Sequence, residues 1–175
     1  MIIKADDLLN IPEFEGISAD VLQQKLEAVE DLIRSYTNNN FQNRYIRLNG
    51  SSDGCLYGFH PFLKVNDTVQ ITESPNNGLY VIKEIDSDNN TITLDRDLYP
   101  VDNNRVTKVE YPAAIIGGVI NLLIWDVQNR DKVGIQSETL SRHSVTYFAQ
   151  DDNNQVLGYP AALLGFLKPY IKARF

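Results

Sequence analysis

The feature of this sequence that most constrains its fold is a change in hydrophobic periodicity, from helical spacing to alternation and back again. From Asp20 to Thr37 the apolar residues recur three and four positions apart, which places them on one face of a helix. They are Val21, Leu22, Leu26, Val29, Leu32, Ile33 and Tyr36. The pattern predicts a helix over residues 20–37, with Ser18 as its N-cap.

From Tyr45 onward apolar residues alternate with polar ones, which is typical of strands with one buried face. Turn sequences rich in Asn, Asp, Gly and Pro separate the alternating segments. The expected strands are residues 45–48, 68–72, 79–85, 91–94 and 105–110. Short strands in close succession close most economically into a small antiparallel barrel, because closure removes unpaired edges.

Helical spacing returns after Pro112 and predicts a helix over residues 113–130 and a last helix over 161–172. Residues 141–148 between them alternate and predict an extended segment or hairpin. We therefore expect an α+β fold in which a small α-helical bundle core of three main helices carries an inserted small antiparallel β-barrel. A short β-hairpin or extended segment precedes the last helix. The expected domains are a helical core of residues 1–44 and 111–175 and a barrel of residues 45–110.

Charge and cysteine content exclude several classes of protein. The chain has 16 basic and 23 acidic residues and a net charge of −7, a poor match for a protein that binds nucleic acid tightly. Its single cysteine, Cys55, excludes a disulfide framework and a multi-thiolate zinc site. We expect neither secretion nor membrane insertion, because no signal-peptide pattern and no membrane-length apolar segment is present.

The sequence contains no motif for catalysis or cofactor binding. The motifs of phosphate-binding loops, dinucleotide folds, zinc proteases and serine hydrolases are all missing. His60 and His143 lie far apart, and neither has a Cys or another His at metal-ligand spacing. We predict no enzymatic activity, no catalytic residues, no metal and no cofactor. A small hydrolase would need a nucleophile and base pair that the sequence does not display.

Four stretches resemble the head-tail connector (adaptor, head-completion) proteins of long-tailed bacteriophages that infect Gram-positive hosts. They are LEAVEDLIRSYT at 26–37 followed by Asn40 and Phe41, WDVQNRDKVGIQSE at 125–138, RHSVTY at 142–147 and GYPAALLGFLKPY at 158–170. The resemblance covers the first long helix and most of the chain after Pro112. Compact members of this family have only a short connection where this chain has its β segment.

The resemblance implies a structural protein of the virion neck that forms a homo-oligomeric, dodecameric ring below the portal. Such a ring extends the DNA channel and joins the capsid to the next head-completion or tail protein. Double-stranded DNA then passes through it without tight binding, which suits an acidic protein. The implied location is the head-tail junction of the virion, and the host cytoplasm during assembly.

Two groups of residues are candidates for the contacts of such a ring. The alternating segment from 136 to 148 suits an edge that pairs with a neighbouring subunit. The subunit-interface candidates are Trp125, Arg130, Arg142, His143, Val145 and Tyr147. The chain ends in an aromatic residue after two cationic ones, directly beyond the last helix, and an apolar residue at a free terminus gains little unless a partner buries it. The portal-docking candidates are Lys168, Tyr170, Lys172, Arg174 and Phe175.

The β segment supports an alternative function. Residues 64–71 and 78–85 are similar to an SH3-like or related small barrel. Such a module serves a binding role as readily as a purely structural one. The alternative is a binding module whose inserted barrel captures a peptide, a host protein or a nucleic acid. The oligomeric state of the purified protein distinguishes this hypothesis from a ring subunit.

Overall fold

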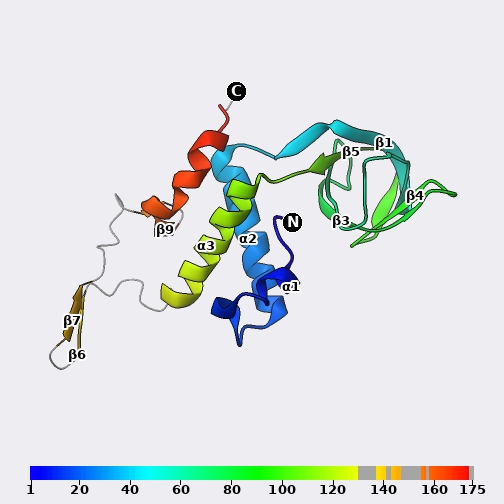
Figure 1. Cartoon of the computed structure of the whole chain (residues 1–175). Coiled ribbons are helices and arrows are strands. Elements are labelled where there is room, and N and C mark those ends of the chain that lie inside the picture. Colours follow the sequence, from blue (N-terminus) through cyan, green and yellow to red (C-terminus); the bar gives the residue numbers. More distant parts are fainter. Residues whose placement is uncertain (130–136, 141–142, 147–154, 157, 174–175) are drawn as a thin grey trace. The chain divides into compact units, whose positions relative to one another are not determined.

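The computed structural model describes residues 1–129, 137–140, 143–146, 155–156 and 158–173 (Figure 1). From 137 to 156 it describes backbone only. The chain divides into two compact units, which we describe separately. The barrel unit is Asn39–Tyr111 together with Met1, and the helical unit is Ile2–Asn38 together with Pro112–Phe175.

Strands β1 to β5 form a closed antiparallel barrel in the order β1-β4-β3-β2-β5 (Figure 1). The strands are β1 (Gln42–Tyr57), β2 (Thr68–Thr72), β3 (Gly78–Asp86), β4 (Thr91–Leu94) and β5 (Leu98–Val109). Alternating side chains point inward and enclose a hydrophobic core. That core contains Leu48, Leu56, Leu63, Val69, Ile71, Tyr80, Ile82, Ile92, Leu94, Leu98 and Val106.

Strand β1 is long and irregular, and its pairing with β5 shifts register at three places. Gly50 allows the strand to bend back on itself, because a Cβ at this position would collide with the carbonyl oxygen of Tyr57. Strand β5 begins at Leu98 and therefore includes residues 100–104, whose proline, aspartate and asparagines are typical of a turn. The barrel thus contains more strand than the alternating segments predicted.

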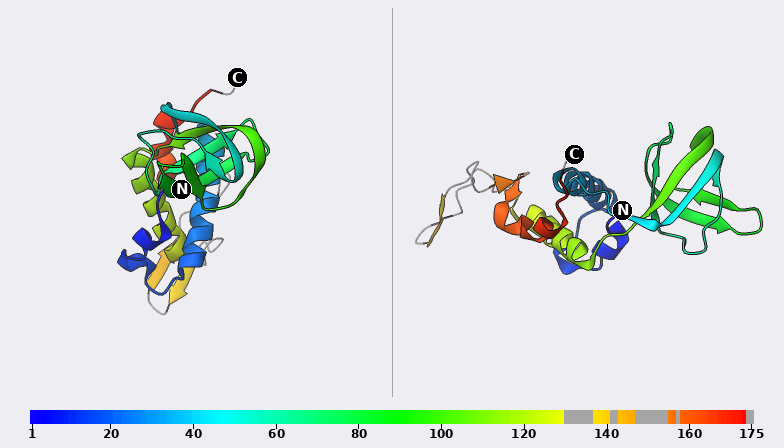
Figure 2. Two further views of the ribbon diagram at one scale, coloured as in Figure 1. Left: turned by 90° about the vertical axis from the view of Figure 1, so that its right-hand side faces the viewer. Right: turned by 90° about the horizontal axis from the view of Figure 1, so that it is seen from above.

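The helical unit contains α1 (Ala5–Leu8), the 3₁₀ turn η1 (Pro12–Phe14), α2 (Ala19–Thr37), α3 (Ala113–Asn129) and the 3₁₀ segment η3 (Ala161–Tyr170) (Figure 2). Helix α2 begins as expected, with the Ser18 hydroxyl oxygen accepting a hydrogen bond from the Val21 N–H at 3.4 Å. It ends at Asn38, which adopts a left-handed conformation with φ 48°. The buried faces of the two long helices contribute Leu22, Leu26, Val29, Ile33, Ile115, Val119, Leu122 and Leu123.

Two short antiparallel pairs complete the helical unit. Strands β6 (Ser137–Leu140) and β7 (His143–Thr146) form a two-stranded sheet, in which Leu140 lies opposite His143. Strands β8 (Gln155–Val156) and β9 (Tyr159–Pro160) form another, directly before η3. No helix in the described ranges is both long enough and apolar enough to cross a membrane.

The expected fold class, a helical-bundle core with an inserted barrel, is wrong. The structure is mixed, and its strands dominate, since more of the described residues lie in strands than in α-helices. The third main helix, expected over 161–172, is instead the 3₁₀ segment η3. Pro169 lacks the N–H that an α-helix would use there, and Gly165 lowers the helix propensity of the segment. Only two long α-helices remain among the described residues, too few for the expected bundle.

Two adjacent glycines of α3 provide a test of the packing between α3 and η3. A Cβ at Gly118 would collide with the Phe166 ring, whereas a Cβ at Gly117 meets open space. We expect Gly118→Ala to lower the free energy of unfolding by roughly 1–3 kcal/mol through overpacking. Gly117→Ala is the control and is expected to raise it by up to about 1 kcal/mol. Urea unfolding followed by fluorescence of the single tryptophan, Trp125, measures both; equal effects would contradict the contact with Phe166.

Candidate functional site

The most exposed aromatic side chain of the barrel lies on a bulge in β1. Asn43 pairs with Lys108 and Arg47 with Thr107, so residues 44–46 bulge out of the β1–β5 ladder. The Tyr45 N–H donates a hydrogen bond to Asn43 Oδ1 at 3.1 Å, which holds the bulge in place. The Tyr45 side chain is 96% exposed, and Arg44 beside it is exposed as well. We call Arg44 and Tyr45 the bulge surface.

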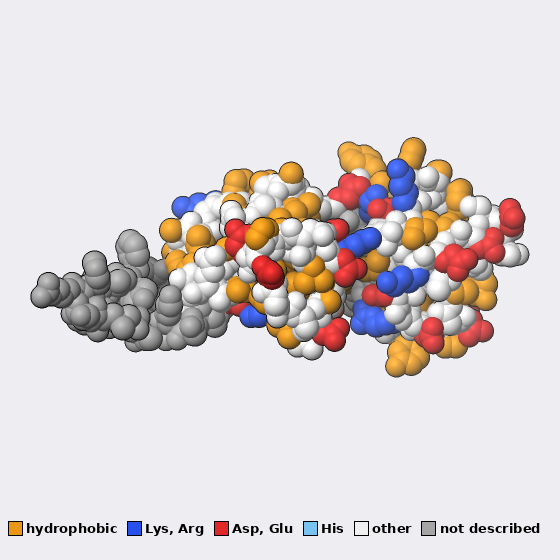
Figure 3. All heavy atoms as spheres, turned by 60° about the horizontal axis from the view of Figure 1, so that its bottom comes forward, with side chains coloured by type: hydrophobic (Ala, Val, Ile, Leu, Met, Phe, Trp, Pro, Cys, Tyr) orange, Lys and Arg blue, Asp and Glu red, His pale blue; other side chains and the backbone are white. Residues whose placement is uncertain are grey.

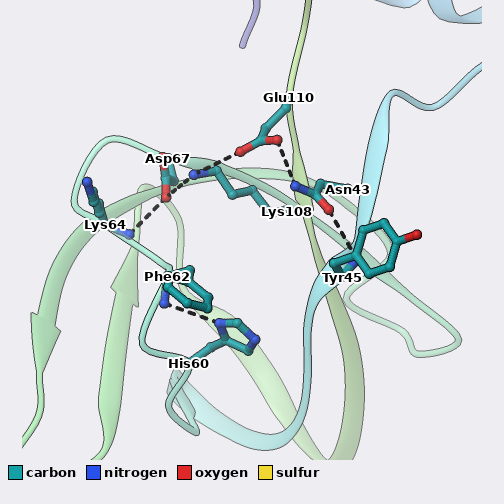
Figure 4. Close-up of polar contacts among 8 residues, drawn as sticks. All are labelled: Asn43, Tyr45, His60, Phe62, Lys64, Asp67, Lys108 and Glu110. Carbon is teal, nitrogen blue, oxygen red and sulfur yellow. Dashed lines mark hydrogen bonds and ion pairs between the residues drawn. The ribbon is translucent and has the colours of Figure 1, made fainter.

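A network of ion pairs lies beneath the bulge (Figure 4). Lys108 Nζ is 2.9 Å from Asp67 Oδ2 and 3.2 Å from Glu110 Oε1. Asn43 Nδ2 donates to Glu110 Oε2 at 2.8 Å and so links the network to the bulge. These contacts connect β1, β5 and the loop before β2 and give the bulge a rigid base.

The network shifts the pKa values of two of its members. Burial disfavours the Lys108 ammonium, but its hydrogen bonds to Asp67 and Glu110 outweigh burial and raise the pKa of Lys108. The hydrogen bond from Asn43 is the main reason that the pKa of Glu110 is lowered, and Lys108 adds to it against the effect of burial. Both groups are therefore held in their charged forms at neutral pH.

These shifts predict how Glu110→Gln affects stability at different pH values. Because folding lowers the pKa of Glu110, its stabilisation is complete above about pH 4.5 and is lost as the pH falls through the folded pKa. We expect Glu110→Gln to destabilise the barrel at pH 7 by less than about 1 kcal/mol, since Glu110 is half exposed. Below the folded pKa the variant and the parent should converge. Hydrogen exchange of the β2 and β5 amides measures the difference in stability between variant and parent as the pH falls, and a difference that grows toward low pH would contradict the lowered pKa of Glu110.

The loop before β2 presents a second aromatic side chain close to this network. Phe62 is 65% exposed, and its N–H donates to His60 Nδ1 at 3.3 Å (Figure 4). The Lys64 N–H donates to Asp67 Oδ2 at 2.8 Å, so Asp67 anchors both the loop and Lys108. Figure 3 shows hydrophobic side chains standing out from the barrel unit, at the right of the view, among both cations and carboxylates.

A groove lies further along the same pair of strands. It has a volume of about 600 Å³ and is lined by Ser51, Ser52, Asp53, Tyr57, Pro75, Pro100, Val101 and Asp102. Asp53, Asp102 and Tyr57 are exposed. A hydrogen bond with Cys55, with a further contribution from the Asp53 carboxylate, raises the pKa of Tyr57, so its phenol stays neutral. The groove therefore combines apolar and aromatic surface with two carboxylates.

A buried polar network supports the groove from below. Asn104 is fully buried; its Nδ2 donates to Gly50 O at 3.1 Å and to Ser52 Oγ at 3.0 Å. Asn76 Nδ2 donates to Asn104 Oδ1 at 3.1 Å and to Tyr99 O at 3.0 Å, and Asn76 Oδ1 accepts from the Tyr99 N–H at 2.8 Å. Every buried side-chain N and O atom in the described part of the chain has a hydrogen-bond partner. The groove is therefore preorganised by the fold.

The predicted subunit-interface residues do not form one described surface. Trp125 is half-buried and lies edge-on to Tyr159, with ring centroids 5.7 Å apart. His143 and Val145 lie on β7, whose backbone alone is described. Arg130, Arg142 and Tyr147 lie outside the described residues. The structure therefore assigns a packing contact within the helical unit to Trp125.

The predicted portal-docking segment is partly tied to its own unit. Lys168 and Lys172 are exposed and Tyr170 is half-buried, whereas Arg174 and Phe175 lie outside the described residues. The Lys172 N–H donates to Thr37 O at 2.8 Å, and Asn38 Nδ2 donates to Ala173 O at 2.9 Å. These bonds satisfy backbone groups at the C-terminal end of α2.

Sequence reasoning missed both the bulge surface and the groove. The adjacent apolar residues Tyr45 and Ile46 interrupt the alternation, and this interruption is the signal that indicates a bulge. Asn76 and Asn104 lie in stretches whose residue types are typical of turns, and that pattern gives no sign that the two side chains are buried and bonded to each other. Within the described ranges, no group of three or more His, Cys, Asp or Glu residues is arranged to hold a metal ion.

Comparison with known proteins identifies no family for this chain. No protein-family model matches it, and no curated protein is similar to it at a significant level.

Proposed function

We propose that the protein is a structural subunit of the neck of a long-tailed bacteriophage. In this role it forms a ring below the portal, extends the DNA channel and joins the capsid to the tail-completion proteins. The proposal is supported by the resemblance of residues 26–37, 125–138, 142–147 and 158–170 to head-tail connectors.

The observation that carries the proposal is that resembling segments far apart in sequence pack against one another. Trp125, in the 125–138 segment of α3, contacts Tyr159 of the 158–170 segment, and Gly118, earlier on the same helix, lies against the Phe166 ring of that segment. The backbone of Lys172, just beyond η3, bonds to Thr37 at the end of α2. A common subunit core requires such packing between its elements, so the resemblance concerns one packed unit and not scattered pieces.

Binding to capsids tests the proposal. Purified protein is mixed with DNA-filled heads that carry a portal but no neck, and bound protein is measured by co-sedimentation and imaged by cryo-electron microscopy. We expect a ring at the portal vertex. A protein lacking residues 174–175 keeps the Lys172 and Ala173 bonds to the end of α2 and is the docking variant, which should stay folded by Trp125 fluorescence but lose head binding. Absence of head binding by the full chain would refute the proposal.

Weak binding to DNA is a further expectation of this function. With a net charge of −7, the protein cannot neutralise many phosphates, so free duplex DNA should bind no tighter than about 10⁻⁶ M. A fluorescence titration at about 0.15 M salt measures the affinity. Sub-micromolar binding would contradict passive passage of DNA through the ring.

One observation favours a binding module as the second candidate function. A tyrosine that is 96% exposed on a rigid bulge, beside an exposed arginine, presents two of the residue types enriched at the centre of protein interfaces. Size-exclusion chromatography with mass measurement separates the candidates, because a binding module remains monomeric whereas a ring subunit associates.

A further inference from the structure

We propose that the bulge surface of one copy binds in the groove of the barrel of a second copy, so that the subunits associate head to tail. This inference rests on the proposed function and names the contact that joins neighbouring subunits.

The two surfaces are complementary in chemistry. The bulge surface carries a guanidinium at Arg44 and an exposed phenol ring at Tyr45. The groove carries carboxylates at Asp53 and Asp102 between Tyr57 and two prolines. Arginine pairs with carboxylates and stacks on aromatic rings, and tyrosine and arginine are the residues most often found at the centre of tight interfaces.

The charges on both sides are available for a partner. Within the described part of the chain, no ion pair involves Arg44, Asp53 or Asp102. Asp67 and Glu110 share the ammonium of Lys108, so Arg44 is the charged group that the bulge surface itself presents. The bulge surface therefore carries one positive charge, and the groove carries the two negative charges of Asp53 and Asp102.

The positions of the two surfaces require different copies to meet. The bulge follows the Asn43–Lys108 pair of the β1–β5 ladder, whereas the groove lies at the Ser52–Val101 pair. Seven residues of strand separate Tyr45 from Ser52, roughly 20 Å along the ladder, so a bulge cannot reach the groove of its own barrel. Two different surfaces that bind each other form a heterologous contact, which closes into a ring when the rotation between subunits permits.

Both surfaces are rigid before contact. The Asn43–Glu110–Lys108–Asp67 network fixes the bulge, and the Asn76–Asn104–Ser52 network fixes the groove. Rigid partners lose little conformational freedom on association, so a small contact of this kind can be specific.

Sedimentation velocity of the full chain over a range of concentrations tests the contact. We expect the parent to associate, and Tyr45→Ala and Arg44→Glu each to weaken association at least tenfold. Asp102→Arg should do the same from the groove side. Lys83→Glu reverses an exposed charge on β3, outside both surfaces, and is the matched control that should leave association unchanged. Hydrogen exchange of the barrel amides verifies that each variant is folded.

Mixing the variants gives the sharpest result. Tyr45→Ala retains a groove and Asp102→Arg retains a bulge, whereas the remaining bulge and groove of the pair would place Arg44 against the arginine introduced in the groove, so their mixture should form a one-to-one dimer and nothing larger. A parent that stays monomeric at all concentrations, or variants that associate like the parent, would overturn the proposal. Binding of a single-stranded oligonucleotide that depends on Arg44, without self-association, would also overturn it and identify a nucleic-acid site.

The bulge–groove contact and the proposed neck function can fail independently of each other, and the experiments distinguish the two failures. If Arg44→Glu still forms complete rings on DNA-filled heads, the neck function stands and the bulge contact is refuted. If the parent associates through Arg44 but does not bind heads, the contact stands and the neck function is refuted.

Discussion

Replacing Asn104 with leucine is expected to lower the free energy of unfolding of the barrel by roughly 3–5 kcal/mol. Asn104 is fully buried, and its side chain bonds Gly50, Ser52 and Asn76 and also accepts from Ser74 Oγ at 2.7 Å. Leucine has a similar volume but leaves several of these buried groups without a partner, at about 1–3 kcal/mol for each.

Native-state hydrogen exchange of β2 and β3 amides measures this loss, because these amides exchange through opening of the barrel. Asn103→Leu is the matched control: it makes the same replacement at the adjacent, exposed position and should change stability by no more than about 0.5 kcal/mol. A loss below about 1 kcal/mol for Asn104→Leu would show that the polar network contributes little to the barrel.

The second large effect is expected for Lys25→Met in the helical unit. Lys25 Nζ of α2 lies 2.5 Å from Asp126 Oδ2 of α3, and the Asp126 side chain is only 4% exposed. Methionine retains the aliphatic stem but removes the cation, so the buried carboxylate loses the countercharge that Lys25 provides. Because Lys25 is 36% exposed and water screens the pair, we expect a loss of roughly 2–3 kcal/mol, below that of a fully buried pair.

The two single substitutions in this ion pair should lower the free energy of unfolding by different amounts. Asp126→Asn releases a lysine that can turn to solvent, so it should cost less than Lys25→Met. The double variant should recover part of the loss because no buried charge remains. Glu27→Gln, which alters the exposed contact with Gln23 on the same helix, is the control and should change stability by less than about 0.5 kcal/mol. Urea unfolding followed by Trp125 fluorescence measures all four; equal losses for the two single variants would contradict the role of Asp126 burial.

Elements whose bounds depend on local pattern were predicted well from the sequence. Strands β2 and β4 have the bounds that alternation predicted, and α2 starts one residue before its predicted start and ends at Thr37. In these segments the periodicity matches the face that is buried, so propensity and packing favour the same structure. The last predicted helix fails for the opposite reason: propensity and apolar pattern disagree there. Pro169 and Gly165 disfavour an α-helix, and the segment adopts 3₁₀ geometry.

The candidate site depends on pairings between distant residues, which no local pattern encodes. The bulge at Tyr45 exists because β1 and β5 pair with a register shift across more than 60 residues of sequence. Asn76 and Asn104 carry the residue type of a turn, and only the closure of the barrel buries them as one network. The groove likewise takes its lining from three separate segments.

The sequence by itself determined the alternation between helical and strand segments, the acidic charge and the N-cap of α2 at Ser18, because these follow from neighbouring residues and composition. Only the tertiary structure decided that strands dominate over helices, that β1 bulges at Tyr45 and that a supported groove forms beside Pro100. The reason is physical: register and burial are set by which distant segments pack together, and that choice belongs to the whole chain.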